Sequence, residues 1–177
     1  SKGGNITKIG FPSYGGNRRP VVSGTQGTWI LTEAGTWQFA KQTGGYQTGW
    51  MYRGGKWWYF NEEGIMQTGW ILSGGRWYYL LPGEGSMLTG WQQVDGAYYY
   101  FHTDGRMLIG WLSDGTNSYY MDPANGRMST GWKQIEGSYY YFNNSGHKLT
   151  GWIQVDGTYY YLNPSDKGRM AASTTLK

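Results

Sequence analysis

The chain has 177 residues, with 31 glycines, 11 tryptophans, 17 tyrosines and no cysteine, and its formal net charge is +4. The lack of cysteine excludes disulfide bonds and a thiol nucleophile. The excess charge comes from residues 1–28, which contain four basic residues and no acid, while the remainder holds 11 basic and 11 acidic residues. A nucleic-acid-binding surface needs clustered basic side chains, so we expect no nucleic-acid partner.

Residues 1–28 are rich in glycine, proline and serine, and their apolar residues have no regular spacing. This composition is typical of a linker or an irregular cap. We therefore divide the chain into an irregular N-terminal segment, 1–28, and a second region, 29–177, which has a clear pattern. No apolar run approaches the roughly 20 residues that span a bilayer, so we expect no membrane span.

From Trp29 onward the chain repeats one pattern every 20 or 21 residues. Each copy opens with a tryptophan, which follows a glycine in every copy except the degenerate first one. The tryptophans of the later copies are Trp50, Trp70, Trp91, Trp111, Trp132 and Trp152. A fixed period of this length indicates stacked supersecondary units rather than a conventional globular domain.

We number each repeat from its tryptophan, which is position zero. Positions +4 and +5 hold a Gly-Gly, Asp-Gly or Glu-Gly pair in five repeats, which predicts a two-residue hairpin turn because such turns need positive φ angles. These pairs are Gly54-Gly55, Gly74-Gly75, Asp95-Gly96, Glu136-Gly137 and Asp156-Gly157. In the repeat that begins at Trp111 the pair shifts to Asp114-Gly115, so we expect an altered turn there.

Positions +7 to +10 form the second strand of each hairpin and are mostly aromatic. Since side chains alternate between the faces of a strand, +8 and +10 share one face while +7 and +9 share the other. Position +10 is always apolar and never tyrosine, which predicts a buried column: Phe60, Leu80, Phe101, Met121, Phe142 and Leu162. The Trp and Tyr column at +7 and +9 favours recognition, with a purely structural core as the alternative.

A single hairpin is marginally stable, but stacked hairpins bury their aromatic residues against each other. The sequence therefore predicts an all-β solenoid of about seven β-hairpin repeats, without helices.

The sequence offers no catalytic or metal-binding constellation. His102 and His147, its two histidines, lie in the second turns of different repeats and lack the ligand spacing of a metal site. The acidic residues at +4 are explained by the turn conformation. We therefore predict a binding protein that is not an enzyme and uses no metal or other cofactor.

Aromatic rings at each junction between repeats can form a cage for a quaternary ammonium group. Such a cation cannot donate hydrogen bonds, but ring quadrupoles attract its charge while its methyl groups are buried against the ring faces. Three rings that contribute roughly 0.5–2 kcal/mol each give an affinity near the millimolar range. Several sites would gain avidity on a polymer that carries repeated cations.

The pattern Thr-Gly-Trp, Asp-Gly, Tyr-Tyr-Tyr-Phe and Asp-Gly-x-Met, complete in residues 89–107, resembles the choline-binding (cell-wall-binding) repeat of streptococcal surface proteins and phage lysins. The resemblance covers residues 29–170. It implies a left-handed solenoid in which choline of teichoic and lipoteichoic acids binds between consecutive hairpins. It also implies a secreted module, bound to the bacterial cell wall surface, that anchors an attached murein hydrolase or adhesin.

Carried onto this chain, the resemblance places each choline between position zero, position +7 of the same repeat and position +9 of the next, with a methionine nearby. The four aromatic sets are Trp50, Trp57 and Tyr79; Trp70, Trp77 and Tyr100; Trp91, Tyr98 and Tyr120; and Trp132, Tyr139 and Tyr161. The methionines are Met66, Met87, Met107 and Met128.

Some junctions depart from this pattern. Ser118 and Thr36 replace the +7 ring in their repeats, so we expect weak or empty sites there. Lys148 replaces the methionine of the sixth repeat, which places a cation near the cage of Trp132. The last repeat has no successor, so a site at Trp152 would need a partner chain, and a homodimer through the terminal repeats stays open.

Two other interpretations stay open. Glucan-binding repeat modules use similar Tyr-Tyr-Phe hairpins, and aromatic faces stack on sugars as well as on cations. The repeats could also be a structural spacer that presents a partner domain. Choline binding would exclude the spacer, and a dextran pull-down separates choline from glucan recognition.

Overall fold

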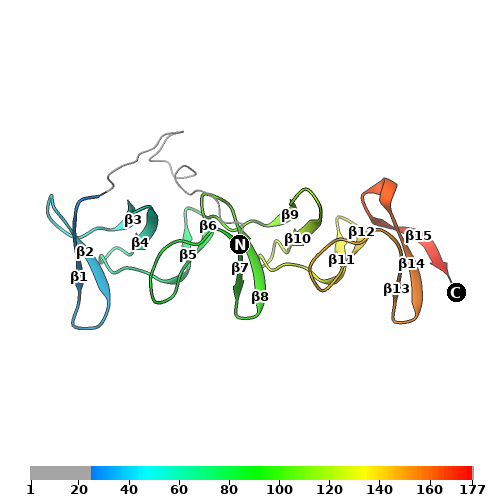
Figure 1. Cartoon of the computed structure of the whole chain (residues 1–177), viewed down its shortest axis with the longest axis horizontal. Helices are drawn as coiled ribbons and strands as arrows, with labels where there is room; N and C mark the ends of the chain where they lie inside the picture. Colours follow the sequence, from blue (N-terminus) through cyan, green and yellow to red (C-terminus); the bar gives the residue numbers. More distant parts are fainter. Residues whose placement is uncertain (1–24, 177) are drawn as a thin grey trace. The chain divides into compact units, whose positions relative to one another are not determined.

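The computed structural model describes residues 25–176, which form short antiparallel strands joined by turns (Figure 1). No helix in this part of the chain is long and apolar enough to cross a membrane. The chain forms two compact units. The first contains the residues up to Val94 together with Tyr100–Met107, and the second contains Asp95–Tyr99 together with the residues from Leu108 onward. The irregular segment predicted for 1–28 falls almost wholly on residues 1–24, which lie outside the described residues.

Consecutive strands pair as seven hairpins along residues 25–176. They are β1 (Gly27–Leu31) with β2 (Trp37–Lys41), β3 (Gly49–Arg53) with β4 (Lys56–Phe60), β5 (Gly69–Ser73) with β6 (Arg76–Leu80), β7 (Gly90–Val94) with β8 (Ala97–Phe101), β9 (Gly110–Ser113) with β10 (Ser118–Met121), β11 (Gly131–Ile135) with β12 (Ser138–Phe142), and β13 (Gly151–Val155) with β14 (Thr158–Asn163). After the short 3-10 turn η2 (Pro164–Asp166), β15 (Arg169–Leu176) pairs antiparallel with β14. The predicted all-β class of stacked hairpin repeats is confirmed.

The two-residue turns form where the sequence predicts them. Asp95, Glu136 and Asp156 each have a φ of 51°, and the glycine that follows each also has a positive φ. Positive φ at both central residues is the requirement of the type I′ turn, which matches the twist of a hairpin. The turn after β9 is wider, as expected, and the carboxylate of Asp114 accepts hydrogen bonds from two backbone N–H groups of that turn.

Strand register sorts the side chains of each hairpin between two faces. In β3–β4, Trp50 lies opposite Tyr59 and Tyr52 lies opposite Trp57, so positions zero, +2, +7 and +9 share one face, which we call the tryptophan face. The opposite face, with positions +1, +3, +8 and +10, is the core face. Position +10 has 0% exposure in the six later hairpins, which confirms the predicted buried column of Phe60, Leu80, Phe101, Met121, Phe142 and Leu162.

Within each unit, the core face of a hairpin packs on the tryptophan face of the hairpin before it. Ile71, Tyr78 and Leu80 of β5–β6 form one buried cluster with Trp57, and Trp50 packs against this cluster. In the second unit, the corresponding cluster is Ile135, Tyr140 and Phe142, with Tyr120 packed against it. Large aromatic residues therefore share the core with aliphatic ones, which dominate the core of a conventional domain.

The segment between consecutive hairpins is held by a backbone hydrogen bond to the preceding hairpin. After β4, the backbone N–H of Met66 donates to the carbonyl oxygen of Trp37 in β2, at 2.8 Å. The equivalent bonds, 2.8–2.9 Å long, join Met87 to Trp57, Met107 to Trp77, Met128 to Tyr98 and Lys148 to Ser118. These four later bonds each bring the end of one repeat beside position +7 of the repeat before it.

Candidate ligand-binding cages

The first cage lies between hairpins β1–β2 and β3–β4. Trp29 of β1 stands edge-on to Trp37 of β2 and to Trp58 of β4, with ring centroids 6.3 and 5.1 Å apart. Together with Met66, these three indoles line a hollow of about 360 Å³, and Trp37 stays 38% exposed. A hollow of this size lies at the small end of ligand pockets, and its ring walls suit a compact organic cation.

The expectation that this junction lacks its second ring is wrong. Thr36 does occupy position +7, but the first hairpin closes with a three-residue turn over residues 33–35, because the N–H of Thr32 donates to the carbonyl of Thr36 at 2.8 Å. The extra residue shifts the second strand by one position relative to a two-residue turn. Trp37 therefore takes the place that Trp57 has in the next hairpin.

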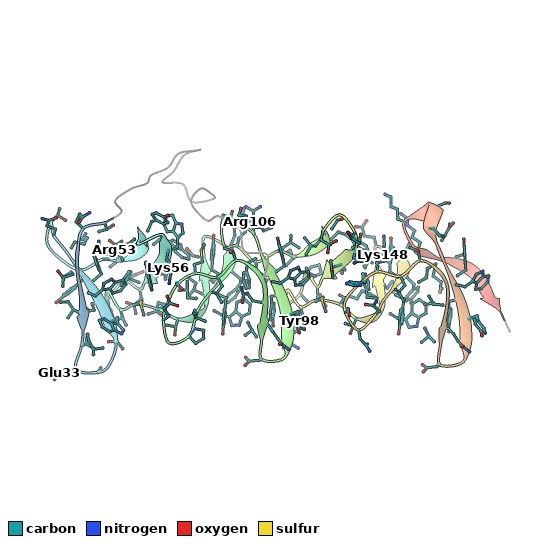
Figure 2. All side chains as sticks on the ribbon, viewed as in Figure 1. Glu33, Arg53, Lys56, Tyr98, Arg106 and Lys148 are labelled. Carbon is teal, nitrogen blue, oxygen red and sulfur yellow. The ribbon has the colours of Figure 1, made fainter. Side chains whose placement is uncertain are left out.

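A carboxylate lies at the first cage as well. Glu84, in the segment after β6, lines the same hollow. It accepts a hydrogen bond at 2.6 Å from the ammonium group of Lys56, a side chain labelled in Figure 2. This hydrogen bond lowers the pKa of Glu84 below its ordinary value, so the carboxylate is ionised at neutral pH. The carboxylate is already shared with the ammonium group of Lys56, so the three ring faces supply most of the attraction for a positively charged occupant.

The second junction holds the same types of residue in a closed arrangement. Trp50 stands edge-on to Trp57 of its own hairpin at 6.3 Å and to Tyr78 of the next hairpin at 4.9 Å. Trp57 is only 3% exposed and shares a buried cluster with Met87. The ring of Tyr52 lies 5.2 Å from that of Trp57 and covers it. The predicted pair is thus brought together, but Trp57 offers no open face to a ligand.

The third hairpin repeats the edge-on pair in an open form. Trp70 and Trp77 have ring centroids 6.3 Å apart, and Trp77 is 42% exposed. Position +2 here is Leu72, whose own side chain is exposed and leaves the indole uncovered. The backbone N–H of Met107 donates to the carbonyl of Trp77, so the methionine belongs to this junction.

The tyrosines at position +9 pack on their own hairpins, which corrects the predicted third member of the three sets that lie within one compact unit. Tyr79 lies 4.9 Å from Trp70 of its own hairpin, because the antiparallel register puts the two residues opposite each other on one face. The same contact, at 5.0–5.3 Å, joins Tyr100 to Trp91, Tyr120 to Trp111 and Tyr161 to Trp152. The ring from the next hairpin instead comes from position +8, which joins Trp58 to Trp29, Tyr78 to Trp50, Tyr140 to Trp111 and Tyr160 to Trp132.

The second unit contains one further open junction. Trp132 and Tyr160 have ring centroids 4.8 Å apart, and Tyr139 at position +7 is 43% exposed. The remaining predicted set, Trp91, Tyr98 and Tyr120 with Met128, draws on both compact units and stays a prediction.

Lys148 lies at the fifth junction and not, as expected, beside Trp132. Its ammonium nitrogen stands 5.3 Å from the ring centroid of Trp111 and donates to the backbone carbonyl of Lys167 at 2.5 Å. The reason is that each connecting segment reaches back to the preceding hairpin, where the N–H of Lys148 donates to the carbonyl of Ser118. The chain's own cation therefore stands over the indole of this junction.

The two histidines lie in different surroundings. Burial, and then the charge of Arg106, lower the pKa of His102 below its ordinary value. His147 stands edge-on to Tyr119 with ring centroids 5.3 Å apart. Among residues 25–176, no group of three or more His, Asp or Glu side chains could hold a metal ion.

Several cage residues were missed from the sequence: Trp37, Glu84 and the rings at position +8, which are Trp58, Tyr78, Tyr140 and Tyr160. The register of the two-residue turn is the signal for Trp58 and Tyr78, because it sets position +8 on the face toward the preceding hairpin. Trp37 is identified when the positions of the first repeat are counted from its turn rather than from Trp29. No local signal marks Glu84, which comes from the hairpin after next.

The repeat that builds these junctions matches a family model. The choline-binding repeat matches residues 47–89, 88–130 and 129–174. The chain belongs to the choline-binding repeat family. It is thus a module of choline-binding repeats, which confirms the resemblance found in the sequence. No curated protein sequence matches this chain.

Solved structures of choline-binding proteins share the fold. Choline-binding protein F of Streptococcus pneumoniae is 37% identical, with a TM-score of 0.74 over 82% of this chain and 48% of its own. CbpJ of Streptococcus pneumoniae TIGR4 is 33% identical, with a TM-score of 0.74 over 86% of this chain and 59% of its own. The pneumococcal cell-wall endolysin of phage Cp-1, complexed with choline, is 29% identical, with a TM-score of 0.52 over 75% and 40%. This chain thus spans about half the length of choline-binding protein F.

Proposed function

We propose that this chain is a non-catalytic anchoring module that binds choline between consecutive hairpins. The first cage is the observation that carries the proposal, since Trp29, Trp37 and Trp58 surround a hollow edged by Met66 and Glu84. A trimethylammonium group offers no N–H donor, so ring faces and a nearby carboxylate are the groups that can recognise it.

The number of cages matters because each one is weak. Three rings at roughly 0.5–2 kcal/mol each give an affinity near the millimolar range. A polymer that carries many cholines can engage several cages and gains by effective concentration. The partner we propose is therefore the choline of teichoic and lipoteichoic acids, and the place is the bacterial cell wall surface, reached by secretion.

The relatives support this assignment. The endolysin of phage Cp-1 was solved with choline, and choline-binding protein F in the presence of a peptidoglycan analogue. By analogy, the module would hold an attached effector, such as a murein hydrolase or an adhesin, close to the wall.

The proposal is tested by titrating intrinsic tryptophan fluorescence with choline and with 3,3-dimethyl-1-butanol, its neutral isostere. We expect a saturable change with choline in the millimolar range and a much weaker one with the isostere, because only the cation gains from the ring quadrupoles and from Glu84. An equal response to both compounds would contradict a cation cage. Saturation by glucose oligomers alone would favour the glucan-binding alternative.

Two substitutions at one position sharpen the test. Trp37→Phe keeps an aromatic face, whereas Trp37→Leu keeps apolar bulk without it. Trp37 is partly exposed, so both variants should fold. We expect the Leu variant to lose binding at the first cage and the Phe variant to keep part of it. Equal affinities in the two variants would remove the role of the ring.

A further inference from the structure

The fifth junction, between β9–β10 and β11–β12, is built like the first cage in its backbone but not in its side chains. Ser118 stands where the first cage has Trp37, and Lys148 stands where it has Met66, as the equivalent N–H to carbonyl hydrogen bonds show. The stem of Lys148 also packs beside a glycine, since a Cβ added at Gly168 would lie 3.2 Å from its Cε. The backbone of a cage is thus retained while two of its walls are replaced.

These replacements reverse the charge of the site. The junction keeps a hollow of about 460 Å³, lined by Lys148, Lys167 and Arg169 and by one carboxylate, Glu136. Three cations against one anion leave the walls positive. Outside these walls, Asp166 lies 3.8 Å from Arg169, a distance at which a solvent-exposed pair is weak. A quaternary ammonium group entering here would meet like charge, with Lys148 already standing over the indole.

Hydroxyl groups complete an arrangement that suits an oxyanion. Ser118 and Ser138 line the same hollow and can each donate a hydrogen bond. Lysine and arginine bind phosphate oxygens through charge-assisted hydrogen bonds, and arginine can do so with two parallel bonds. Burial and the neighbouring Lys167 lower the pKa of Lys148, and a bound anion would stabilise the charged form of this ammonium group.

We propose that the fifth junction binds a phosphate group, through Lys148, Lys167 and Arg169, in place of choline. The site lies wholly within the second compact unit, and the inference does not rest on choline binding at the other junctions. Inorganic phosphate is the simplest probe. Its charge and four oxygens match the three cations and two hydroxyls of the lining.

The test is a titration of the full chain with inorganic phosphate, followed by amide NMR at pH 7, with sodium chloride adjusted to hold the ionic strength constant. We expect saturable shifts of the amide signals of Ser118 and Lys148. Lys148→Met, which restores the methionine of the other repeats, should weaken binding about tenfold or more, since a hydrogen bond to a charged group is lost. Arg169→Gln should also weaken phosphate binding, and because the Arg169 side chain is exposed, this substitution should leave the folding of the chain unchanged.

Lys41→Met is the matched control, because it removes the same charge from a strand of the other unit. Its phosphate affinity should equal that of the parent chain. Shifts that never saturate, or equal affinities in the Lys148, Arg169 and Lys41 variants, would overturn the proposal, because diffuse attraction would then explain the response.

Two further probes, glycerol phosphate and dimethyl phosphate, distinguish a terminal phosphate monoester from a phosphodiester as the natural ligand. Tight binding of the dianionic monoester alone indicates a terminal phosphate group. Comparable binding of the diester indicates the backbone of a phosphodiester polymer. Both results support the site, whereas failure of all three phosphates to bind would overturn it. Choline added at saturation should not displace phosphate, which distinguishes this site from the proposed cages.

Discussion

The residue at position +2 decides whether a cage is open. It lies on the tryptophan face, directly opposite position +7, so its side chain can cover the +7 ring. Tyr52 does so at the second junction and leaves Trp57 buried, whereas Leu72 leaves Trp77 uncovered. Glutamine holds this position in several later repeats. A single side chain outside the cage thus separates a closed junction from an open one.

Tyr52→Gln should convert the second junction into a binding site. Removing the ring exposes Trp57 between Trp50 and Tyr78, and we expect choline stoichiometry, measured by equilibrium dialysis, to rise by about one per chain at millimolar affinity. Leu72→Gln is the matched control and should add no site, since its tryptophan is already open. Unchanged stoichiometry in the Tyr52 variant, despite greater acrylamide quenching of its tryptophans, would refute the role of position +2.

At the scale of the hairpin, glycine and methionine set the distance between consecutive repeats. A Cβ added at Gly85 would lie 2.7 Å from Sδ of Met66, and one added at Gly105 would meet Sδ of Met87 still more closely. Gly146 and Met128 repeat the contact in the second unit. The glycine of these second turns therefore serves the preceding repeat as well as its own turn, because it lets the methionine of that repeat pack flat.

Gly105→Ala should destabilise the protein more than Gly115→Ala. Both glycines have nearly the same positive φ, 92° and 93°, but only Gly105 has a neighbour within 4 Å of the added methyl group. The backbone strain is therefore similar, and overpacking against the buried Met87 should cost about 1–3 kcal/mol more in the free energy of unfolding. Urea denaturation of the two variants measures the difference. Equal losses would mean that Met87 moves aside freely.

Much of the hairpin was predictable from the sequence because its determinants are local. The turn pairs at Asp95, Glu136 and Asp156 fix positive φ angles, and the alternation of side chains then places residues such as Phe60 and Phe142 in the core. The contact between hairpins was not predictable in the same way. Which ring meets Trp50 depends on a strand of the next repeat, and family pairing pointed to Tyr79 where the register brings Tyr78.

The positions of the charged residues at the candidate sites were also not predictable from local sequence patterns. Glu84 reaches the first cage from the hairpin after next, and Lys148 serves the junction before the one its sequence position suggests. Both placements follow from the backward reach of the connecting segments, which local patterns do not encode. The second ring of the first cage was missed for a different reason. The three-residue turn of the first hairpin puts Trp37, rather than Thr36, in the place that position +7 has in the other hairpins.

At the scale of the whole molecule, stability should be a sum of hairpins and the interfaces between neighbours. Each described cage is built by two consecutive hairpins, apart from Glu84 at the first cage, so its ligand binds only where those hairpins are stacked. The unfolded chain has the same rings but does not hold them around a hollow. A ligand of the cages must therefore stabilise the folded state, even where each cage binds weakly.

Choline should accordingly raise the urea midpoint of the chain. A ligand present at 100 times its dissociation constant adds about 2.7 kcal/mol for each occupied site, so two or more open cages should give a large shift. The slope of the unfolding free energy against urea should not change, because the surface exposed on unfolding is the same. Trp37→Leu should reduce the choline-dependent shift by the share of one cage. Sodium chloride at equal ionic strength is the control, and a midpoint that rises as much in chloride as in choline would attribute the effect to ionic strength and exclude the cages as its cause.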